Sequence, residues 1–248
     1  MTRVAWAAKA RGMLLLAWWG LNLFTVGVLI VLLCAVFRHP SIIFLPARIV
    51  FQIGNWMAGV RVKVSGYERL RKGQPYIFVS NHASWLDPII MFLHLGANHA
   101  LLVKKELYKI PILSQGLNLI GCAKIDRSNR EAAIASTRQA AERVRQGRSF
   151  IVYPEGTRSP DGTMRPFKKG AFHLAIEVGA PIVPVTVDGT HRIMPKGTIG
   201  VTPGTVHLIV HDPIDVSPYT PEQAGLLAER AWQAVHSGFG QSAATVSS

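Results

Sequence analysis

Residues 75–88 read PYIFVSNHASWLDP and join a short apolar run to a polar segment and then to a second apolar run. The run Tyr76–Val79 is aromatic and β-branched and predicts a buried strand, whereas Pro88–Leu95 predicts a helix. Between them, four residues separate His82 from Asp87, which is about one helical turn or a tight loop. A carboxylate at that spacing can orient the imidazole as a general base. Taken alone, the pair is also typical of a polar loop in which a histidine packs or caps.

Outward from this stretch, short apolar strands alternate with helices over most of the remaining chain. Because strands separated by crossover helices pair in parallel, the fold class is α/β, with a mixed, mostly parallel sheet flanked by helices. The expected strands are Arg61–Val64, Tyr76–Val79, Ala100–Val103, Cys122–Ile125, Ser149–Tyr153, Ile182–Val187 and Thr205–Val210. The expected helices are Pro88–Leu95, Ser128–Gln146, Gly170–Val178 and Pro221–His236, the last with a capping box from Thr220 to Gln223.

Three polar segments follow expected strands, namely Ser80–Asp87, Asp126–Arg130 and Pro154–Ser159. Ligands gather where strands of such sheets end at their carboxyl edge, so we expect these segments to converge. The convergence would put the following side chains in one cleft: His82, Asp87, Arg127, Glu155 and Arg158.

The segment Glu155–Arg158 carries a carboxylate, a glycine, a hydroxyl and a guanidinium directly after a strand. Gly156 permits close backbone approach to a ligand, and the planar fork of Arg158 suits phosphate. An arginine in this position is also often a surface ion-pair partner. Arg127 follows another strand, and Lys104 and Lys105 follow a third, so several cations are expected to face one cleft and favour a phosphate ligand. The basic run Arg165–Lys169 suits anionic lipid head groups or a phosphorylated carrier.

The composition narrows the class of partner. The chain has 248 residues and a formal net charge of +13, which favours an anionic partner. Its mean hydropathy is positive, at +0.24, so lipid or a phosphorylated metabolite is expected rather than nucleic acid. The two cysteines, Cys34 and Cys122, exclude a disulfide framework and lack metal-site spacing.

The N-terminal region is predicted to attach to a membrane. No charge interrupts the chain between Arg11 and Arg38, and Met13–Phe37 can cross a hydrocarbon core of about 30 Å. The segment Ile42–Val60 reads as an amphipathic interfacial helix, with Arg48, Gln52 and Asn55 on its polar face, or as a helix packed on the domain. Basic residues flank the apolar run on both sides, which fits a half-inserted hairpin, with a single span as the alternative. We therefore expect a membrane-associated helical hairpin over residues 1–60, a catalytic α/β domain over 61–240 and a disordered tail over 241–248.

Four segments together resemble the signature motifs of the glycerolipid acyltransferases, the 1-acylglycerol-3-phosphate acyltransferase family. They are Asn81-His82-x4-Asp87, Gly121-x-x-Lys124-Ile125-Asp126-Arg127, Glu155-Gly156-Thr157-Arg158 and Ala180-Pro181-Ile182-Val183-Pro184-Val185, in family order and over roughly Val62 to Val210. The resemblance implies transfer of a fatty acyl group from acyl-CoA or acyl-carrier protein to the sn-2 hydroxyl of lysophosphatidate, with no metal or other cofactor. It also implies a bacterial inner membrane location, with the catalytic domain facing the cytoplasm.

Residue chemistry and the resemblance assign the same roles. His82 would deprotonate the acceptor hydroxyl, Asp87 would fix the imidazole tautomer, and Ser84 would be a structural hydroxyl. Arg127 and Arg158 would bind the phosphate, with Lys105 as a weaker candidate. Glu155 would bind the glycerol portion, with Gly156 and Thr157 beside it. Lys124 stands where the family more often has an apolar or aromatic residue, and would alter chain-length preference if it pointed into the acyl path.

Other functions stay open at this point. Within the transferases, the acceptor could be another lysophospholipid, a lyso-aminolipid or glycerol 3-phosphate. A metal-dependent hydrolase would use His82 and Asp87 as ligands, but His94, His99 and His173 are scattered without motif spacing. A non-catalytic lipid-binding membrane protein would explain the charge and the apolar N-terminus but would leave the His–Asp pair without a role.

Overall fold

A seven-stranded mixed sheet forms the centre of the protein. The structure is a computed structural model, and it describes residues 3–37, 40–96, 98–125 and 130–240. The strand order is β1-β7-β6-β2-β5-β3-β4, and every pairing is parallel except that of β6 with β7. The strands are β1 Val60–Ser65, β2 Ile77–Ser80, β3 His99–Lys104, β4 Ala123–Ile125, β5 Ser149–Val152, β6 Ile182–Asp188 and β7 Gly204–Val210. All seven expected strands are present, and the predicted fold class is confirmed.

The central strand β2 pairs with β5 and β6, and Ile77 lies opposite Phe150 and Ile182. All three side chains are fully buried. Strands buried on both faces read as continuous apolar runs, which is why Tyr76–Val79 shows no alternation of polar and apolar residues. The register therefore places the carboxyl ends of β2 and β5 side by side, where the two predicted functional loops begin.

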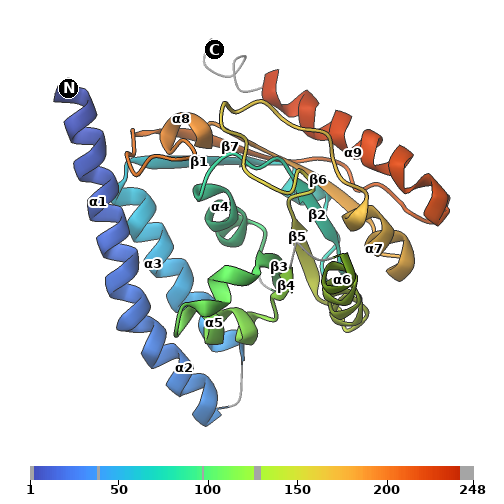
Figure 1. The fold of residues 1–248 in the computed structure, drawn as a ribbon, viewed down its shortest axis with the longest axis horizontal. Coiled ribbons are helices and arrows are strands. Elements are labelled where there is room, and N and C mark those ends of the chain that lie inside the picture. The colour runs from blue at the N-terminus through green and yellow to red at the C-terminus, as the bar shows by residue number, and fades with distance from the viewer. Residues whose placement is uncertain (1–2, 38–39, 97, 126–129, 241–248) are drawn as a thin grey trace.

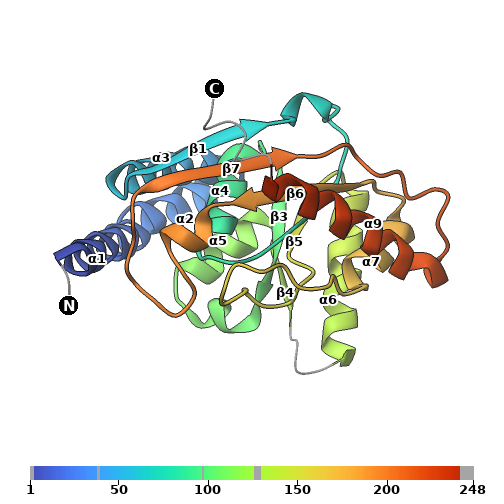
Figure 2. The same ribbon diagram turned by 90° about the horizontal axis from the view of Figure 1, so that it is seen from above.

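Helices cover both faces of the sheet (Figures 1 and 2). On one face, α6 Arg130–Arg145, α7 Gly170–Val178 and α9 Ala224–Ser237 bury Val144, Phe172 and Leu227 in a core shared with β2, β5 and β6. On the other face, α4 Leu86–His94 buries Leu86 and Ile90 against the sheet. The capping box precedes α9 in a short 3-10 turn, Pro221–Gln223, where the Thr220 N–H donates to Gln223 Oε1 at 3.0 Å.

Two helical segments were not expected from the sequence. α5 Leu113–Ile120 ends at Gly121, which has φ 86°, and it follows the 3-10 turn Lys105–Lys109. α8 Thr190–Ile193 is a single turn after β6. Both segments are too short to show a clear helical period, so their placement depends on tertiary contacts.

The N-terminal element is a helical hairpin against the α4 side of the domain (Figure 1). α1 Arg3–Phe24 and α2 Val26–Phe37 run on from one another, and the chain returns through the 3-10 turn Pro40–Ile43 into α3 Phe44–Met57. The two arms are joined by the Trp18 indole N–H, which donates to the Val50 carbonyl at 2.9 Å. α1 also binds the domain, since the Val201 N–H donates to the Ala8 carbonyl at 2.9 Å.

The outer surface of this hairpin is strongly apolar. The stretch Val4–Phe37 is the one candidate span in the described part of the chain, with a mean hydropathy of 2.5 over an 18-residue window that is 11% buried. Its exposed side chains, together with those of α3, include Trp6, Leu14, Leu21, Phe24, Leu29, Leu32, Val36, Phe37, Leu45, Ile49 and Trp56. So large an exposed apolar surface marks a membrane or protein contact, and its length indicates membrane association.

The predicted polar face of α3 is not a single exposed stripe. Asn55 is buried and Gln52 is exposed, whereas Leu45, Ile49 and Trp56 are also exposed. The helix packs through Phe51, which meets Phe92 of α4 edge-on with ring centroids 5.9 Å apart. α3 therefore packs on the domain, which is one of the two expected arrangements, and at the same time presents apolar side chains outward beside Gln52.

Candidate active site

His82 and Asp87 form a hydrogen-bonded pair at the junction of β2 and α4. Nδ1 of His82 lies 2.8 Å from Oδ2 of Asp87, and Asp87 is fully buried in the first turn of α4. The same Oδ2 accepts hydrogen bonds from the N–H groups of Ala83 at 2.7 Å and Ser84 at 2.8 Å. The buried carboxylate is thus stabilised by backbone donors and by the helix N-terminus. With its proton on Nδ1 towards Asp87, the imidazole presents Nε2 as a proton acceptor.

The backbone and ring of His82 are held from the β5 side. Its N–H donates to Glu155 Oε1 at 2.8 Å, and its carbonyl accepts from the Ser159 N–H at 2.7 Å. Tyr153 stacks on the imidazole with ring centroids 4.1 Å apart and an interplanar angle of 23°. The Glu155–Ser159 loop is therefore a direct support of the histidine as well as a candidate ligand site.

The side chain of Asn81 binds the His82 loop to the neighbouring strand β6. Its Nδ2 donates to the Val187 carbonyl at 2.8 Å, and its Oδ1 accepts from the Val187 N–H at 2.8 Å. The side-chain amide thus imitates a peptide group and extends the β2–β6 pairing by one residue. The signal for this role in the sequence is an asparagine directly after a buried strand, where its side chain can bond a neighbouring backbone.

Ser84 is a structural hydroxyl, as expected. It is fully buried, and its Oγ donates to the Met194 carbonyl at 2.9 Å and accepts from the Leu86 N–H at 3.2 Å. The Ser84 hydroxyl consequently ties the His82 loop to the segment after α8.

Glu155 braces two segments of backbone. Oε1 accepts from the His82 N–H at 2.8 Å, and Oε2 accepts from the Arg165 N–H at 3.1 Å. Burial raises the pKa of Glu155 to about 7, although the two N–H donors favour its charged form. Within the described residues, Glu155 forms no ion pair with Arg158.

Arg158 presents an incompletely satisfied guanidinium. Its Cζ lies 4.3 Å from the centroid of the Trp85 ring, in a cation–π arrangement. Its Nη1 is buried and has no hydrogen-bond partner among the described residues. Burial lowers the pKa of Arg158, and the negative charge of Asp87 opposes that effect. A buried donor without an acceptor is costly, so this geometry favours an anionic ligand at Arg158.

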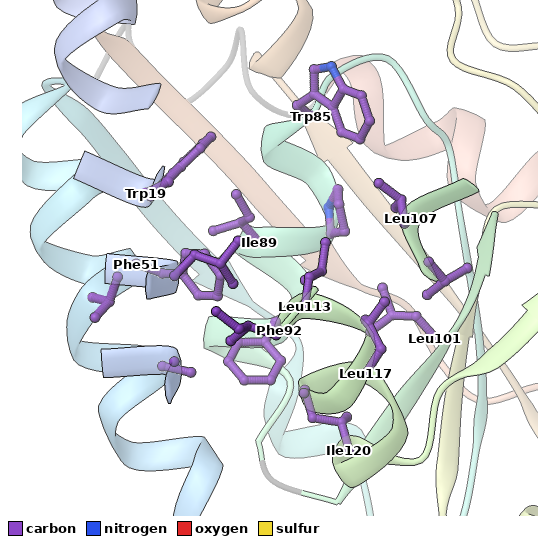
Figure 3. A pocket seen from close by; sticks show the side chains of 18 of the residues that line it. Trp19, Phe51, Trp85, Ile89, Phe92, Leu101, Leu107, Leu113, Leu117 and Ile120 are labelled. Atoms are coloured by element: carbon purple, nitrogen blue, oxygen red, sulfur yellow. The ribbon is translucent and has the colours of Figure 1, made fainter. Parts of the chain in front are cut away.

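An apolar groove of about 890 Å³ leads from this site into the interface between the hairpin and the domain (Figure 3). Figure 3 shows Trp85 and Ile120 at opposite ends of the groove, with Trp19 and Phe51 of the hairpin along one side. Its polar lining includes His82, Thr157, Arg158, Lys104 and Lys196. The further apolar lining includes Leu23, Ile30, Ile89, Phe92, Leu101, Leu107, Leu113 and Leu117.

The structure brings some of the predicted site residues together and leaves others apart. His82, Thr157 and Arg158 line the groove, whereas Asp87 and Glu155 lie behind them as partners of His82. Gly156 makes the turn between Glu155 and Thr157 with φ 80°, a left-handed conformation that favours glycine. Lys105 lies in the 3-10 turn after β3 and is exposed, and Arg127 lies outside the described residues.

The sequence did not single out three residues that the structure places at the site: Trp85, Tyr153 and Lys196. Lys104, one of the cations expected after β3, also lines the groove. Trp85 lies inside the first motif and Tyr153 at the end of an expected strand, but their contacts with Arg158 and His82 depend on the fold. The side chain of Lys124 lies 4.8 Å from the Tyr108 ring centroid and is exposed outside the groove. Among the described residues, no three histidine, cysteine, aspartate or glutamate side chains gather as a candidate metal site.

Comparison with known proteins gives the family. The acyltransferase family model matches residues 61–188, so the chain belongs to the acyltransferase family. It is similar to proteins named 1-acyl-sn-glycerol-3-phosphate acyltransferase, with 33% identity to that of Borreliella burgdorferi over 70% of this chain and 69% of that protein. The corresponding yeast protein, from Saccharomyces cerevisiae, is 35% identical over 82% of this chain and 68% of its own length.

The likeness extends to three-dimensional structure. The crystal structure of the 1-acyl-sn-glycerophosphate (LPA) acyltransferase PlsC from Thermotoga maritima matches with a TM-score of 0.80 and 28% identity, covering 93% of this chain and 95% of that one. The chloroplastic protein BAT2 of Brassica napus is 37% identical over 62% of this chain. The match spans only 45% of BAT2, so the plant relative contains much sequence outside the shared region.

Proposed function

We propose that this protein transfers a fatty acyl group from a thioester donor to the sn-2 hydroxyl of 1-acylglycerol 3-phosphate, giving phosphatidate. The observation that carries the proposal is the His82–Asp87 pair, 2.8 Å apart, opening into an apolar groove beside the unpartnered guanidinium of Arg158. This reaction needs three parts: a general base, a space for the acyl chain and a site for the anionic phosphate. The activities named for the relatives support the same assignment.

In this mechanism, His82 Nε2 removes the proton from the acceptor hydroxyl as its oxygen attacks the thioester carbonyl. Asp87 holds the imidazole orientation and stabilises the imidazolium that forms. The tetrahedral intermediate then collapses, the C–S bond breaks, and the departing thiolate takes the proton from Nε2. The acceptor oxygen is itself the nucleophile, so no acyl-enzyme forms and no metal or other cofactor takes part.

Arg158 would bind the acceptor phosphate, with Arg127 and Lys105 as further candidates, and the groove would hold an acyl chain. Thr157 lines the groove beside Arg158 and would contact the acceptor, with Gly156 allowing close approach. Glu155 contacts the backbone of His82, so a contact with the glycerol portion would be additional to that role. The donor is acyl-CoA or acyl-carrier protein.

The location that fits this function is the cytoplasmic face of a bacterial inner membrane. The exposed apolar side chains of α1, α2 and α3 would enter the bilayer, and membrane lipids would surround the hairpin. A lysophosphatidate acceptor resides in that bilayer, so its acyl chain can reach the groove without crossing water.

The test follows thiol release by the detergent-purified protein with acyl-CoA or acyl-carrier protein, against a panel of acceptors. The panel contains lysophosphatidate, glycerol 3-phosphate, another lysophospholipid and a lyso-aminolipid, each with and without a chelator. We expect release that needs lysophosphatidate, survives the chelator and is abolished by His82→Ala without a change in thermal unfolding. Phosphate release that is sensitive to the chelator would instead show a metal-dependent hydrolase.

A further inference from the structure

Lys196 lies at the polar end of the groove although it belongs to none of the predicted motifs. It lines the groove together with His82, Thr157 and Arg158. Its Nζ donates to the carbonyl oxygen of Arg158 at 2.8 Å. That single bond places the ammonium group next to the segment that carries the candidate phosphate-binding arginine.

The guanidinium of Arg158 and the ammonium group of Lys196 both line this end of the groove. An ammonium group has three N–H donors, and the bond to the Arg158 carbonyl uses one of them. In the described part of the chain, neither Lys196 nor Arg158 forms an ion pair with a carboxylate. Nη1 of Arg158 also lacks a partner among the described residues, so a bound anion would accept hydrogen bonds from both side chains.

The segment that carries Lys196 is fixed to the His82 loop. The Met194 carbonyl accepts the Ser84 hydroxyl at 2.9 Å, and the Met194 N–H donates to the Thr190 carbonyl at 2.9 Å. Gly197 follows Lys196 with φ 87°, so the chain turns sharply directly after the lysine. Lys196 is thereby held at a defined position relative to the catalytic loop, as a specific ligand contact requires.

We propose that Lys196 is a second cationic ligand of the acceptor phosphate and that it selects a phosphate monoester over uncharged or diester head groups. The inference rests on the proposed function and identifies a residue that recognises its acceptor. A phosphate monoester carries a charge of about −1.5 to −2 at neutral pH, so one guanidinium leaves it only partly neutralised. Arg158 supplies a planar fork and Lys196 a point charge, and together they match the dianion better than a singly charged diester.

The test compares Lys196→Gln with Lys196→Arg in the purified protein. Glutamine keeps an N–H donor for the Arg158 carbonyl but lacks the charge, whereas arginine keeps the charge. Lys72→Gln is the matched control, because it removes one positive charge from an exposed loop position. We expect Lys196→Gln to raise the KM for lysophosphatidate by about tenfold or more, with little change in kcat and in the KM for acyl-CoA. Lys196→Arg should recover most of the loss, and Lys196→Gln should leave the rate with 1-acylglycerol, which lacks a phosphate, equal to that of the wild type.

The outcomes separate this inference from the proposed function. If the wild-type protein does not acylate lysophosphatidate, the proposed function fails. If the wild type is active and Lys196→Gln keeps its KM for lysophosphatidate, or changes only the KM for acyl-CoA, then Lys196 does not bind the acceptor phosphate. A fall in kcat alone, with an unchanged acceptor KM, would also overturn the assignment.

A second measurement avoids variants altogether. Lysine side chains of the wild-type protein are acetylated with a water-soluble reagent, with and without lysophosphatidate, and the modified positions are read by mass spectrometry. We expect lysophosphatidate to protect Lys196 at least severalfold and to leave Lys72 unchanged. Equal labelling of Lys196 in both conditions contradicts the proposal, even if Lys196→Gln fails to fold.

Discussion

The ring of Tyr153 lies almost parallel to the imidazole of His82, with centroids 4.1 Å apart and planes 23° from one another. The Tyr153 hydroxyl donates to the Met91 sulfur at 3.3 Å, away from the pair. Burial raises the pKa of Tyr153 well above its usual range, with Asp87 adding to the effect, so the phenol stays neutral. Tyr153 therefore acts as a flat surface behind the imidazole rather than as an acid or a base.

The first prediction concerns this stacking. Tyr153→Leu should lower kcat by about tenfold, because the imidazole loses the surface that limits its rotation. Tyr153→Phe keeps the ring and should retain most of the activity, so it is the matched control. Steady-state kinetics with saturating acceptor measures both. Equal losses in the two variants would show that the hydroxyl, and not the ring, is what matters.

The second prediction concerns Asp87. In Asp87→Asn the amide oxygen should take the place of Oδ2, because the N–H groups of Ala83 and Ser84 and Nδ1 of His82 all meet that one atom. The imidazole then keeps its proton on Nδ1 but loses the negative charge that stabilises the imidazolium, so kcat should fall by about 10³- to 10⁴-fold. Thermal unfolding in detergent should show that the fold is retained. A loss of less than tenfold would remove Asp87 from the role of stabilising the imidazolium.

Much of the fold followed from local patterns in the sequence. The strands around Tyr76–Val79 and Ile182–Val187 are continuous apolar runs because both of their faces are covered, and such runs are recognisable without a structure. The His82–Asp87 pair was predictable for a similar reason, since both residues belong to one turn at a strand end.

What the sequence could not show depends on contacts between distant segments. Lys196 reaches the groove because the Met194 carbonyl is bound by Ser84, and nothing in its own neighbourhood indicates that position. Likewise, the carboxylate of Glu155 was expected to face a ligand, yet both of its oxygens bind backbone N–H groups. α3 exposes Leu45, Ile49 and Trp56 as well as Gln52, and periodicity alone does not show which side of the helix meets the domain.

The third prediction concerns the effect of Glu155 on stability. Its pKa is raised to about 7 from an ordinary value of 4.5, so the folded state binds this proton more tightly than the unfolded state between those pH values. The contribution of Glu155 to stability is therefore fully present below pH 4.5 and is lost as the pH rises through 7, by on the order of 3 kcal/mol. The variant Glu155→Gln has no ionisable side chain at this position, so its stability should decline less steeply as the pH rises. Thermal unfolding midpoints of both proteins from pH 5 to pH 8 test this, and parallel profiles would contradict it.

The fourth prediction concerns Arg158. Arg158→Ala removes the guanidinium whose Nη1 lacks a partner, so the KM for lysophosphatidate should rise by about 10- to 100-fold, with a smaller effect on kcat. Arg158→Lys keeps the charge without the planar fork, so its KM for lysophosphatidate should lie between those of the wild type and Arg158→Ala. Initial rates at varied acceptor and fixed donor give both constants. If the KM for the donor changed and that for the acceptor did not, the phosphate assignment would be wrong.

The fifth prediction concerns the space in the groove at Gly116 of α5. A Cβ added there would lie 3.6 Å from Cδ1 of Ile43, an ordinary contact, so Gly116→Ala should fit and stabilise the helix by about 0.5–1 kcal/mol. Gly116→Leu extends a larger side chain into the groove that we propose holds an acyl chain. It should shorten the longest chain that is transferred efficiently, while the rate with short acyl-CoA donors stays close to that of Gly116→Ala. Competition between acyl-CoA donors of graded length, with products resolved by mass spectrometry, measures the shift. An unchanged length profile in Gly116→Leu would mean that the acyl chain does not occupy the groove beside α5.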